Sequence, residues 1–372
     1  MSGGLRKLLG RRFTSSLRIG LVGLPNVGKS ALYNLVTAEG AGVASENYPF
    51  CTIDPSTAAA VVGDEVLDGL QTVAPGAKMV PALLNVTDIA GLVAGAAEGE
   101  GLGNKFLAEI READAIAHIV RCFDDGRTTH VVSGLDRPSP ADDVATIETE
   151  LALADVETTG RALARAKGKG ALATGARAVV GAVHDHLQGG GGMVASMGEG
   201  LRNLLDEHPE GAQALRALQL LTAKPVVYVA NVGDDWLTDG SGSGAMLAEL
   251  TAAVGGDSAV VPVPVALEAE LADLDAADAD EYLVELGLPA SAASAGSQKL
   301  IHTAYSDCLD LGSFYTCGET EVRAWTIQKG MTAREAAKVI HADFYDAFVK
   351  MEARGTRARA GADRGQGVCH GR

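Results

Sequence analysis

The sequence predicts an α/β fold built on a parallel sheet, and three observations lead to that prediction. The chain has 372 residues and is 47% hydrophobic, which is enough apolar material for a sizeable core and for two or three domains. Short apolar runs alternate with helical stretches from residue 17 to about residue 135. The first apolar run, Leu17 to Val22, passes through a glycine-containing turn directly into a helix, Ala31 to Val36. A strand, a turn and a helix in this order form the first unit of such a fold.

The residues before this strand differ from the rest of the chain in charge. Residues 1–16 contain basic residues but no acidic one, and Leu5, Leu8, Leu9 and Phe13 recur among them at helical spacing. A leader that is rich in Arg, contains Ser and lacks acidic residues is typical of a transit peptide for a mitochondrion or a plastid. The alternative is an unstructured basic extension of a cytoplasmic protein.

The turn after the first strand has the composition of a phosphate-binding loop. Its eight residues are Gly23, Leu24, Pro25, Asn26, Val27, Gly28, Lys29 and Ser30. The two glycines allow successive backbone N–H groups to point inward, so the loop and the helix start form a positive concavity for phosphate oxygens. Lys29 supplies a charge for the β- and γ-phosphates, and Ser30 supplies a hydroxyl ligand for Mg²⁺. We therefore expect these residues to bind a nucleotide, with Lys29 also acting in catalysis.

Two later segments supply the other expected metal and phosphate contacts. Thr52 lies in an irregular segment, where its hydroxyl and carbonyl groups are able to close on Mg²⁺ and the γ-phosphate. The apolar strand Ala82 to Val86 runs into a D-x-x-G motif that begins at Asp88 and ends at Gly91. Asp88 is expected to hold Mg²⁺ through a bound water, and the Gly91 N–H group to contact the γ-phosphate. The predicted metal ligands are therefore Ser30, Thr52 and Asp88.

Composition argues against several other classes of protein. The formal net charge of -17 disfavours a protein that wraps nucleic acid electrostatically, and sequence-specific DNA binding is not expected. The five cysteines are scattered without a C-x-x-C pair, so neither a zinc site nor a disulfide framework is predicted. No apolar run reaches the roughly 18 residues of a membrane span, so no membrane partner is expected. The oligomeric state is left open.

Eight longer motifs resemble those of one known family. They are GLPNVGKS, NYPFCTIDP, DIAGLVAGAAEGEGLGNKFL, DAIAHIVRCF, ETELALAD, KPVVYVANV, LEAELADL and VRAWTIQKG. Together they resemble the Obg-like ATPase family, the YchF branch of the translation-factor-related P-loop proteins, from about Leu17 to Met351. The resemblance implies an ATPase, with GTP as a second substrate, that acts with Mg²⁺ on the ribosome or the translation machinery. The alternative is a nucleotide-dependent binding module whose hydrolysis is incidental or absent.

The resemblance also implies how the chain is divided. It implies a P-loop nucleotide-binding domain, like the G domain of GTPases, over residues 17–297, with a helical hairpin arm inserted at about 146–222. An incomplete α+β TGS-like domain follows over 298–352, and then a disordered tail over 353–372. Apolar residues at helical spacing agree with the arm, and the glycine run Gly189 to Gly192 predicts a break in it. Thr332 is a predicted helix N-cap in the last domain.

The chain departs from guanine-specific relatives at the catalytic position and at the base. Leu92 follows the D-x-x-G motif where those relatives have Gln, and an apolar side chain cannot orient a water. In the family a histidine at the position of His118 is suggested to act instead; the alternative is a core histidine. At the base, Asn231, Val232 and Asp234 are the expected contacts. Val232 in place of Lys favours ATP, and Asp234 favours GTP, so the base preference stays open with ATP favoured.

Overall fold

The computed structural model describes residues 17–38, 40, 56–89, 102–124, 138–165, 172–238, 242–255, 258–288 and 294–350. The predicted leader at 1–16, Thr52, Gly91 and the tail at 353–372 lie outside the described residues. Among the helices of the described part, none is both long and apolar enough to cross a membrane.

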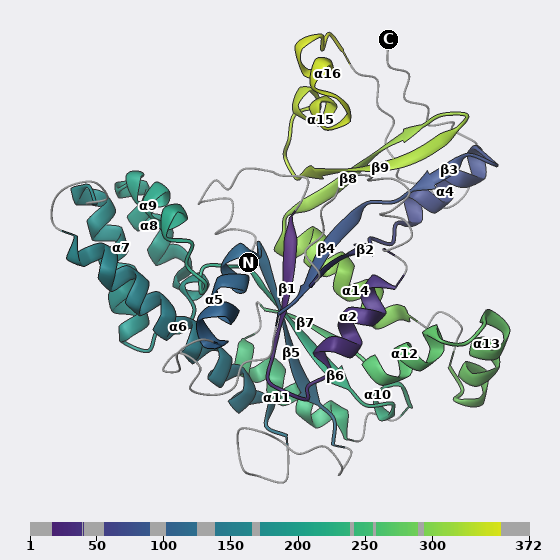
Figure 1. Ribbon diagram of the computed structural model, residues 1–372, viewed down its shortest axis with the longest axis horizontal. Coiled ribbons are helices and arrows are strands. Elements are labelled where there is room, and N and C mark those ends of the chain that lie inside the picture. The colour runs from purple at the N-terminus through teal and green to yellow at the C-terminus, as the bar shows by residue number, and fades with distance from the viewer. Residues whose placement is uncertain are drawn as a thin grey trace.

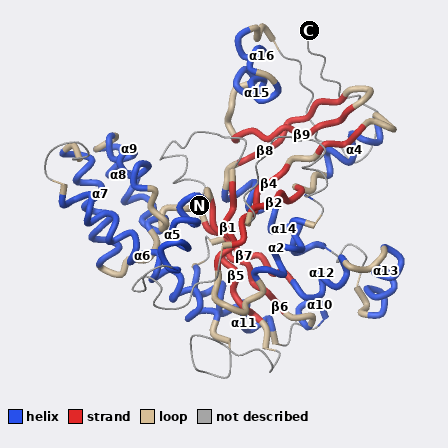
Figure 2. Tube along the Cα trace, viewed as in Figure 1, coloured by secondary structure: helices blue, strands red, loops and turns tan. Residues whose placement is uncertain are grey.

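A six-stranded sheet forms the centre of the molecule (Figures 1 and 2). Its strands are β1 (Arg18–Val22), β2 (Thr57–Val61), β4 (Leu83–Asp88), β5 (Ala115–Cys122), β6 (Val226–Val232) and β7 (Ala259–Val263). They lie in the order β2-β4-β1-β5-β6-β7, and only β2 is antiparallel to its neighbour. Every residue of β5 is buried, because helices cover both faces of a parallel sheet. The predicted α/β architecture is confirmed.

Helices pack on both faces of this sheet. On one face α2 (Lys29–Thr37) packs against α12 (Val265–Ala272) and α14 (Ala295–Thr303), and on the other α6 (Pro140–Ala164) packs against α11 (Ser243–Val254) and β5. The remaining helices of this part are α4 (Glu65–Val73), α5 (Leu102–Glu112), α10 (Asp235–Thr238) and α13 (Ala276–Glu285). The domain boundary expected after residue 297 falls within α14, which packs on β7 and α2 and continues into a π-helical turn, Ala304–Cys308.

The arm contains more helices than the expected hairpin. It consists of α6, α7 (Thr174–Gln188), η1 (Val194–Met197), α8 (Gly198–Glu207) and α9 (Glu210–Leu218), and it stands to one side of the sheet in Figure 1. Its first helix, α6, begins at Pro140, and Val144 near that start packs with residues of β5 and α11. The break expected at the glycine run is confirmed, since α7 ends at Gln188 and both Gly190 and Gly192 have positive φ angles. Valines of α7 and leucines of α8 and α9 form an apolar core of the arm's own.

Asp155 joins the two ends of the arm. It lies on α6 with no exposed surface, and one carboxylate oxygen accepts a hydrogen bond from Leu221 N at 3.0 Å. The other oxygen accepts from Thr222 N at 2.8 Å and from Thr222 Oγ1 at 2.7 Å. The chain that leaves the arm is therefore fixed to the helix that enters it.

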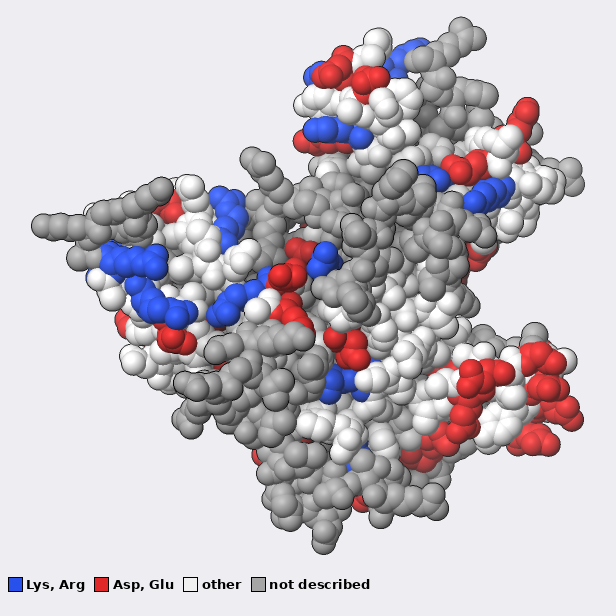
Figure 3. All heavy atoms as spheres, viewed as in Figure 1, with Lys and Arg blue, Asp and Glu red and all other residues white. Residues whose placement is uncertain are grey.

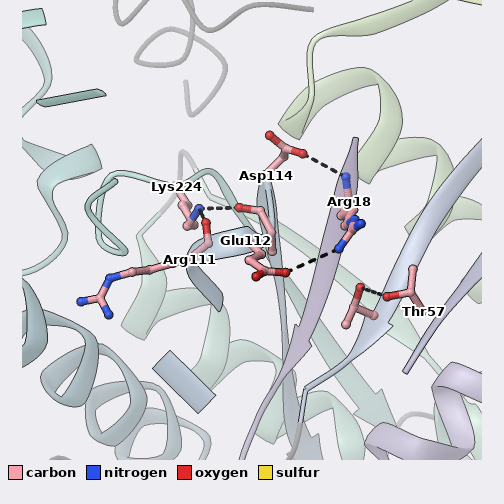
Figure 4. Close-up of polar contacts among 8 residues, drawn as sticks. Arg18, Thr57, Arg111, Glu112, Asp114 and Lys224 are labelled. Carbon is pink, nitrogen blue, oxygen red and sulfur yellow. Dashed lines mark hydrogen bonds and ion pairs between the residues drawn. The ribbon is translucent and has the colours of Figure 1, made fainter. Parts of the chain in front are cut away.

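Lys224 attaches the base of the arm to the sheet (Figure 4). Its buried ammonium donates to the carbonyl oxygen of Arg111 at 3.0 Å and to that of Ala113. These carbonyls end α5, where a helix lacks intrahelical donors, so the lysine satisfies them. Arg18 N donates to Asp114 Oδ2 at 3.1 Å nearby, which joins the start of β1 to the same turn.

The C-terminal part forms a second, small sheet that includes a strand of the nucleotide-binding part. Its strands are β3 (Lys78–Val80), β9 (Glu321–Gln328) and β8 (Leu311–Cys317), in that order. Tyr315 OH donates to Asp64 Oδ2 at 2.6 Å, and Asp64 also caps α4. The short helices α15 (Ala333–Ile340) and α16 (Ala342–Asp346) follow. Thr332 caps α15 in a full capping box with Glu335, which confirms the predicted N-cap.

Candidate nucleotide-binding site

The phosphate loop lies at the carboxyl edge of the large sheet, between β1 and α2. Because β1 has β4 on one side and β5 on the other, the loop opens at the crevice where the strand order reverses. Gly28 has φ of 96°, in the left-handed region that favours glycine, and a Cβ atom there would lie 2.5 Å from Asn231 Nδ2. A Cβ atom on Gly23 would lie 2.5 Å from the carbonyl oxygen of Ile119. Both glycines are thus required by close packing as well as by backbone conformation at Gly28.

Lys29 is folded over the loop from the first turn of α2. Its Nζ atom donates hydrogen bonds to the carbonyl oxygens of Gly23 at 3.0 Å and Leu24 at 2.9 Å, and the residue is only 8% exposed. Burial lowers the pKa of Lys29 from its ordinary value, and the charge of Asp88 partly opposes that shift. The loop therefore holds the ammonium group in place over its own backbone.

Ser30 and Asp88 come together at the same edge. Ser30 Oγ donates to Asp88 Oδ2 at 3.2 Å, although the residues are 58 positions apart in the sequence. A hydroxyl and a carboxylate oxygen beside a phosphate loop are the hard ligands that Mg²⁺ prefers, and phosphate and water oxygens complete such sites. These two residues fit the metal. No group of three or more His, Cys, Asp or Glu side chains suited to a metal occurs in the described ranges.

Asn231 connects the end of β6 to the phosphate loop. Its Nδ2 atom donates to the carbonyl oxygen of Val27 at 2.9 Å. Val232, one residue on, is buried on the other side of the strand in a cluster with Val144 and Leu250, so its side chain is not brought to the loop. Asp234 is exposed just beyond the strand. Of the three expected base contacts, the structure places Asn231 at the loop, while Asp234 lies exposed two residues after the end of β6.

Two residues that sequence reasoning missed hold the turn that follows Asn231. Asp235 accepts hydrogen bonds from the backbone N–H groups of Gly242 at 2.9 Å and Ser243 at 2.8 Å. Ser243 Oγ donates to Asp235 Oδ1 at 2.7 Å and accepts from Gly233 N at 2.9 Å. This network fixes the backbone on which Asp234 sits. The sequence signal was weak, because seven residues separate the two and no motif of fixed spacing joins them.

Phe123 is a third residue that sequence reasoning did not single out. It follows β5 directly, and its Cβ atom lies 3.4 Å from the position that a Cβ atom on Gly233 would occupy. The guanidinium of buried Arg121 lies 4.7 Å from the centre of the Phe123 ring. An aromatic residue at the carboxyl end of a buried strand, in a chain with only 4% aromatics, was the available signal.

His118 lies in the middle of β5 and is 2% exposed. Its neighbours across the sheet are Val22 of β1 and Tyr228 of β6. Burial lowers the pKa of His118 to about 3, and the charge of Lys29 adds to that shift. The ring is therefore neutral at neutral pH. Its Nε2 atom has no hydrogen-bond partner among the described residues.

The carboxyl edge of the sheet thus brings together groups suited to three functions. The loop offers backbone N–H groups and an ammonium for phosphates, Ser30 and Asp88 offer oxygens for a metal, and the turn after Asn231 offers polar groups for a base. That combination is suited to a nucleoside triphosphate with Mg²⁺. The other two predicted contacts, Thr52 and Gly91, fall outside the described residues.

Comparison with protein families and known proteins agrees with this geometry. A family model described as a 50S ribosome-binding GTPase (MMR_HSR1) matches residues 18–151, and YchF-GTPase_C, described as a protein of unknown function, matches residues 311–357. The ribosome-binding ATPase YchF of Haemophilus influenzae is 42% identical over 339 residues, which cover 90% of this chain and 87% of that protein. Obg-like ATPase 1 of Rattus norvegicus is 37% identical over 342 residues, or 92% and 83% of the two chains.

A solved structure is similar as well. The YchF GTPase of Schizosaccharomyces pombe matches with a TM-score of 0.70 at 34% sequence identity, over 91% of this chain and 87% of that chain. The match extends over the nucleotide-binding part, the arm and the C-terminal part, because it covers nearly the whole chain.

Proposed function

This chain belongs to the YchF family, and from that premise we propose that it binds ATP with Mg²⁺, hydrolyses it slowly, and alters its contact with the ribosome as it does so. The observation that carries the proposal is the phosphate loop with Lys29 held over it and with Ser30 beside Asp88. The resemblance expected from the sequence motifs is confirmed by the comparisons.

The residues of the loop have separate tasks in this proposal. The backbone N–H groups between Gly23 and Lys29 bind phosphate oxygens, and the Lys29 ammonium exchanges its carbonyl partners for oxygens of the β- and γ-phosphates. Ser30 and Asp88 are the residues that would hold the metal. When bound, Mg²⁺ would neutralise charge on the triphosphate. These contacts position the triphosphate and favour the charge that develops on the leaving group.

His118 is the proposed partner of the attacking water, since Leu92 is apolar. A histidine with a pKa near 3 is a weak base at neutral pH, so it is suited to accept a hydrogen bond from the water rather than to remove a proton outright. Its Nε2 atom, which lacks a partner among the described residues, is the acceptor available for this role. His118 is paired with Val22, the last residue of β1, and the phosphate loop begins at the next residue, Gly23.

For the base, we propose that ATP binds at least as tightly as GTP. A guanine reader needs a Lys at the position of Val232, and here that position is a buried apolar side chain. Asp234 is exposed and offers a carboxylate to guanine, so discrimination is modest. Competition between unlabelled ATP and GTP for a fluorescent ATP analogue tests this, and a preference for GTP beyond about tenfold contradicts it.

The ribosome enters the proposal through the relatives, whose names describe ribosome-binding ATPases. The charge distribution agrees with a partner rich in RNA phosphates at the arm. Exposed Arg161, Arg177 and Arg216 lie on arm helices and exposed Arg165 directly follows α6, whereas acidic side chains gather over α12 and α13 (Figure 3). Co-sedimentation with ribosomes, with and without ATP and at two salt concentrations, tests this contact. The arm variant R165E with R177E is expected to bind more weakly.

Phosphate release from Mg²⁺-ATP by the purified chain tests the enzymatic part. We expect slow turnover that Lys29→Ala abolishes, while Lys350→Ala, an exposed lysine of the C-terminal part, leaves the rate unchanged. Removal of Mg²⁺ with a chelator is expected to abolish turnover and to weaken ATP binding. If the wild-type chain binds ATP tightly but releases no phosphate, with or without ribosomes, the chain is a nucleotide-dependent binding module instead of an ATPase.

A further inference from the structure

Tyr228 is the side chain that packs directly against His118. The two residues are paired across the parallel strands β5 and β6, so their side chains lie on the same face of the sheet. Their ring centres are 5.6 Å apart and the ring planes are inclined by 39°. Tyr228 is 5% exposed, which means that the contact is closed to solvent. The imidazole therefore has an aromatic wall on one side.

The wall is itself fixed by a hydrogen bond to the arm. Tyr228 OH donates to Glu148 Oε1 of α6 at 2.6 Å. Burial and the neighbouring Glu148 charge raise the pKa of Tyr228, so the hydroxyl stays protonated and remains a donor. A charge-assisted hydrogen bond of this length holds the phenol ring by its outer end, while the strand holds it at the Cα atom. Tyr228 thus has little freedom to move.

At Nε2, His118 lacks a comparable anchor among the described residues. The packing of its ring against Tyr228 therefore limits how that end of the imidazole moves. The last torsion of a histidine side chain is broad. Without a neighbour packed against the ring, the imidazole plane is able to swing, and Nε2 then points away from the direction in which an acceptor is needed.

We propose that Tyr228 is a positioning residue for hydrolysis, which holds the plane of the His118 ring at the angle that directs Nε2 toward the attacking water. The inference rests on the proposed role of His118. Tyr228 does not touch the nucleotide and acts only through the histidine. Its effect should therefore appear in kcat and disappear when the histidine is absent.

A purely structural role of Tyr228 predicts a different result. Tyr228 also ties α6 to the sheet, and a loss of that tie would loosen the site generally. General loosening weakens nucleotide binding and reduces activity by the same factor whether or not His118 is present, because independent effects multiply. A double-mutant cycle separates the two roles.

The cycle uses four full-length proteins: the wild type, His118→Ala, Tyr228→Leu and the double variant. ATP hydrolysis with Mg²⁺ gives kcat and KM, and titration with a fluorescent ATP analogue gives Kd. We expect Tyr228→Leu to lower kcat about tenfold with Kd unchanged, and to cause no further loss in the His118→Ala background. Tyr228→Phe, which keeps the ring but not the hydrogen bond to Glu148, is expected to recover most of kcat.

Two controls accompany the cycle. Tyr282→Leu removes a partly buried tyrosine from α13, which packs in a separate apolar cluster, and is expected to leave kcat unchanged. If Tyr228→Leu does not fold, Tyr228→Met replaces it in the cycle, because a flexible thioether side chain fills the space without forming a rigid wall.

The possible failures are distinguishable. If His118→Ala retains the wild-type kcat, the catalytic assignment of His118 is wrong and the inference falls with it. If His118→Ala lowers kcat but Tyr228→Leu does not, or if the two losses multiply in the double variant, the assignment of His118 stands and the positioning role of Tyr228 is refuted.

Discussion

Replacement of Asp155 by alanine gives the most direct test of how the arm is held. In the wild type the buried carboxylate accepts hydrogen bonds from Leu221 N, Thr222 N and Thr222 Oγ1 at 2.7–3.0 Å. In Asp155→Ala the Thr222 hydroxyl is free to rotate toward another partner, but the backbone N–H groups of Leu221 and Thr222 are left buried and unpaired. An unpaired buried donor costs about 1–3 kcal/mol, so the pair costs about 2–6 kcal/mol. Relief from desolvating a carboxylate offsets part of this, and we expect a net loss of about 2–4 kcal/mol.

The loss should be local to the arm, so a local assay is required. Native-state hydrogen exchange of amides in α6 to α9 reports the free energy of opening of this part alone. Asp185→Ala, on the exposed face of α7, is the matched control and is expected to change opening by less than about 0.5 kcal/mol. If Asp155→Ala changes the opening free energy of the arm by less than about 1 kcal/mol, the hydrogen bonds of Asp155 do not hold the arm and the reasoning is wrong.

Asp155 also gives the arm a pH dependence of defined sign. Burial raises the pKa of Asp155 from its ordinary value of 3.8, and its hydrogen bonds to Thr222 and Leu221 oppose that shift only in part. As the pH rises above 3.8, the unfolded chain therefore releases this proton before the folded chain does. The stability that Asp155 contributes is greatest at low pH and falls as the pH rises through the raised pKa. The gap in opening free energy between wild type and Asp155→Ala should accordingly narrow from pH 4 to pH 7.

Three further substitutions test other parts of the molecule. Gly28→Ala places a Cβ atom 2.5 Å from Asn231 Nδ2 at a φ of 96°, so the Kd for a fluorescent ATP analogue should rise by about tenfold or more. Gly69→Ala, with open space around the new methyl group, should leave that Kd unchanged. Equal affinities for the two variants contradict the loop geometry. Thr332→Ala should destabilise α15 by about 1 kcal/mol in hydrogen exchange while Thr332→Ser retains the cap, and equal exchange in both variants would argue against the capping box. Lys224→Met fills the same space but leaves two carbonyl oxygens at the end of α5 without the lysine donor. The free energy of opening of α5 amides in hydrogen exchange should therefore fall by about 2–4 kcal/mol. Unchanged exchange in α5 contradicts the capping role of Lys224.

The parts of the fold that could be predicted from the sequence are those with a strong local signal. Parallel strands buried on both faces read as apolar runs, and the strands at Leu17 to Val22 and Ala82 to Val86 were predicted for that reason. β2 escaped prediction because Thr57–Val61 is rich in alanine, which has a weak strand preference. β3 has only three residues, and its partner strand lies some 240 positions further along the chain. The sequence did not predict α7 as a separate helix, and the packing of its valines in the arm core stabilises Thr174–Gln188.

The site divides in the same way. The phosphate loop, Ser30 and Asp88 follow from motifs of fixed spacing, and the structure brings them together. Tyr228 could not be predicted as a neighbour of His118, because the register between β5 and β6 decides which side chains meet across a sheet, and no local pattern encodes it.

The parallel pairing of β3 with β9 has a consequence for the order in which the chain is able to fold during synthesis. Lys78 N donates to the carbonyl oxygen of Thr320 at 2.9 Å, and the strand contacts end at Arg323. A ribosome must therefore add about 240 further residues after β3 before its partner strand exists. During that interval the nucleotide-binding sheet is already able to form, since its last strand ends at Val263. The backbone groups of β3 that later pair with β9 stay unpaired until β9 is synthesised. Completion of the small sheet closes the longest loop in this part of the molecule, so it should be the late and slow event in folding.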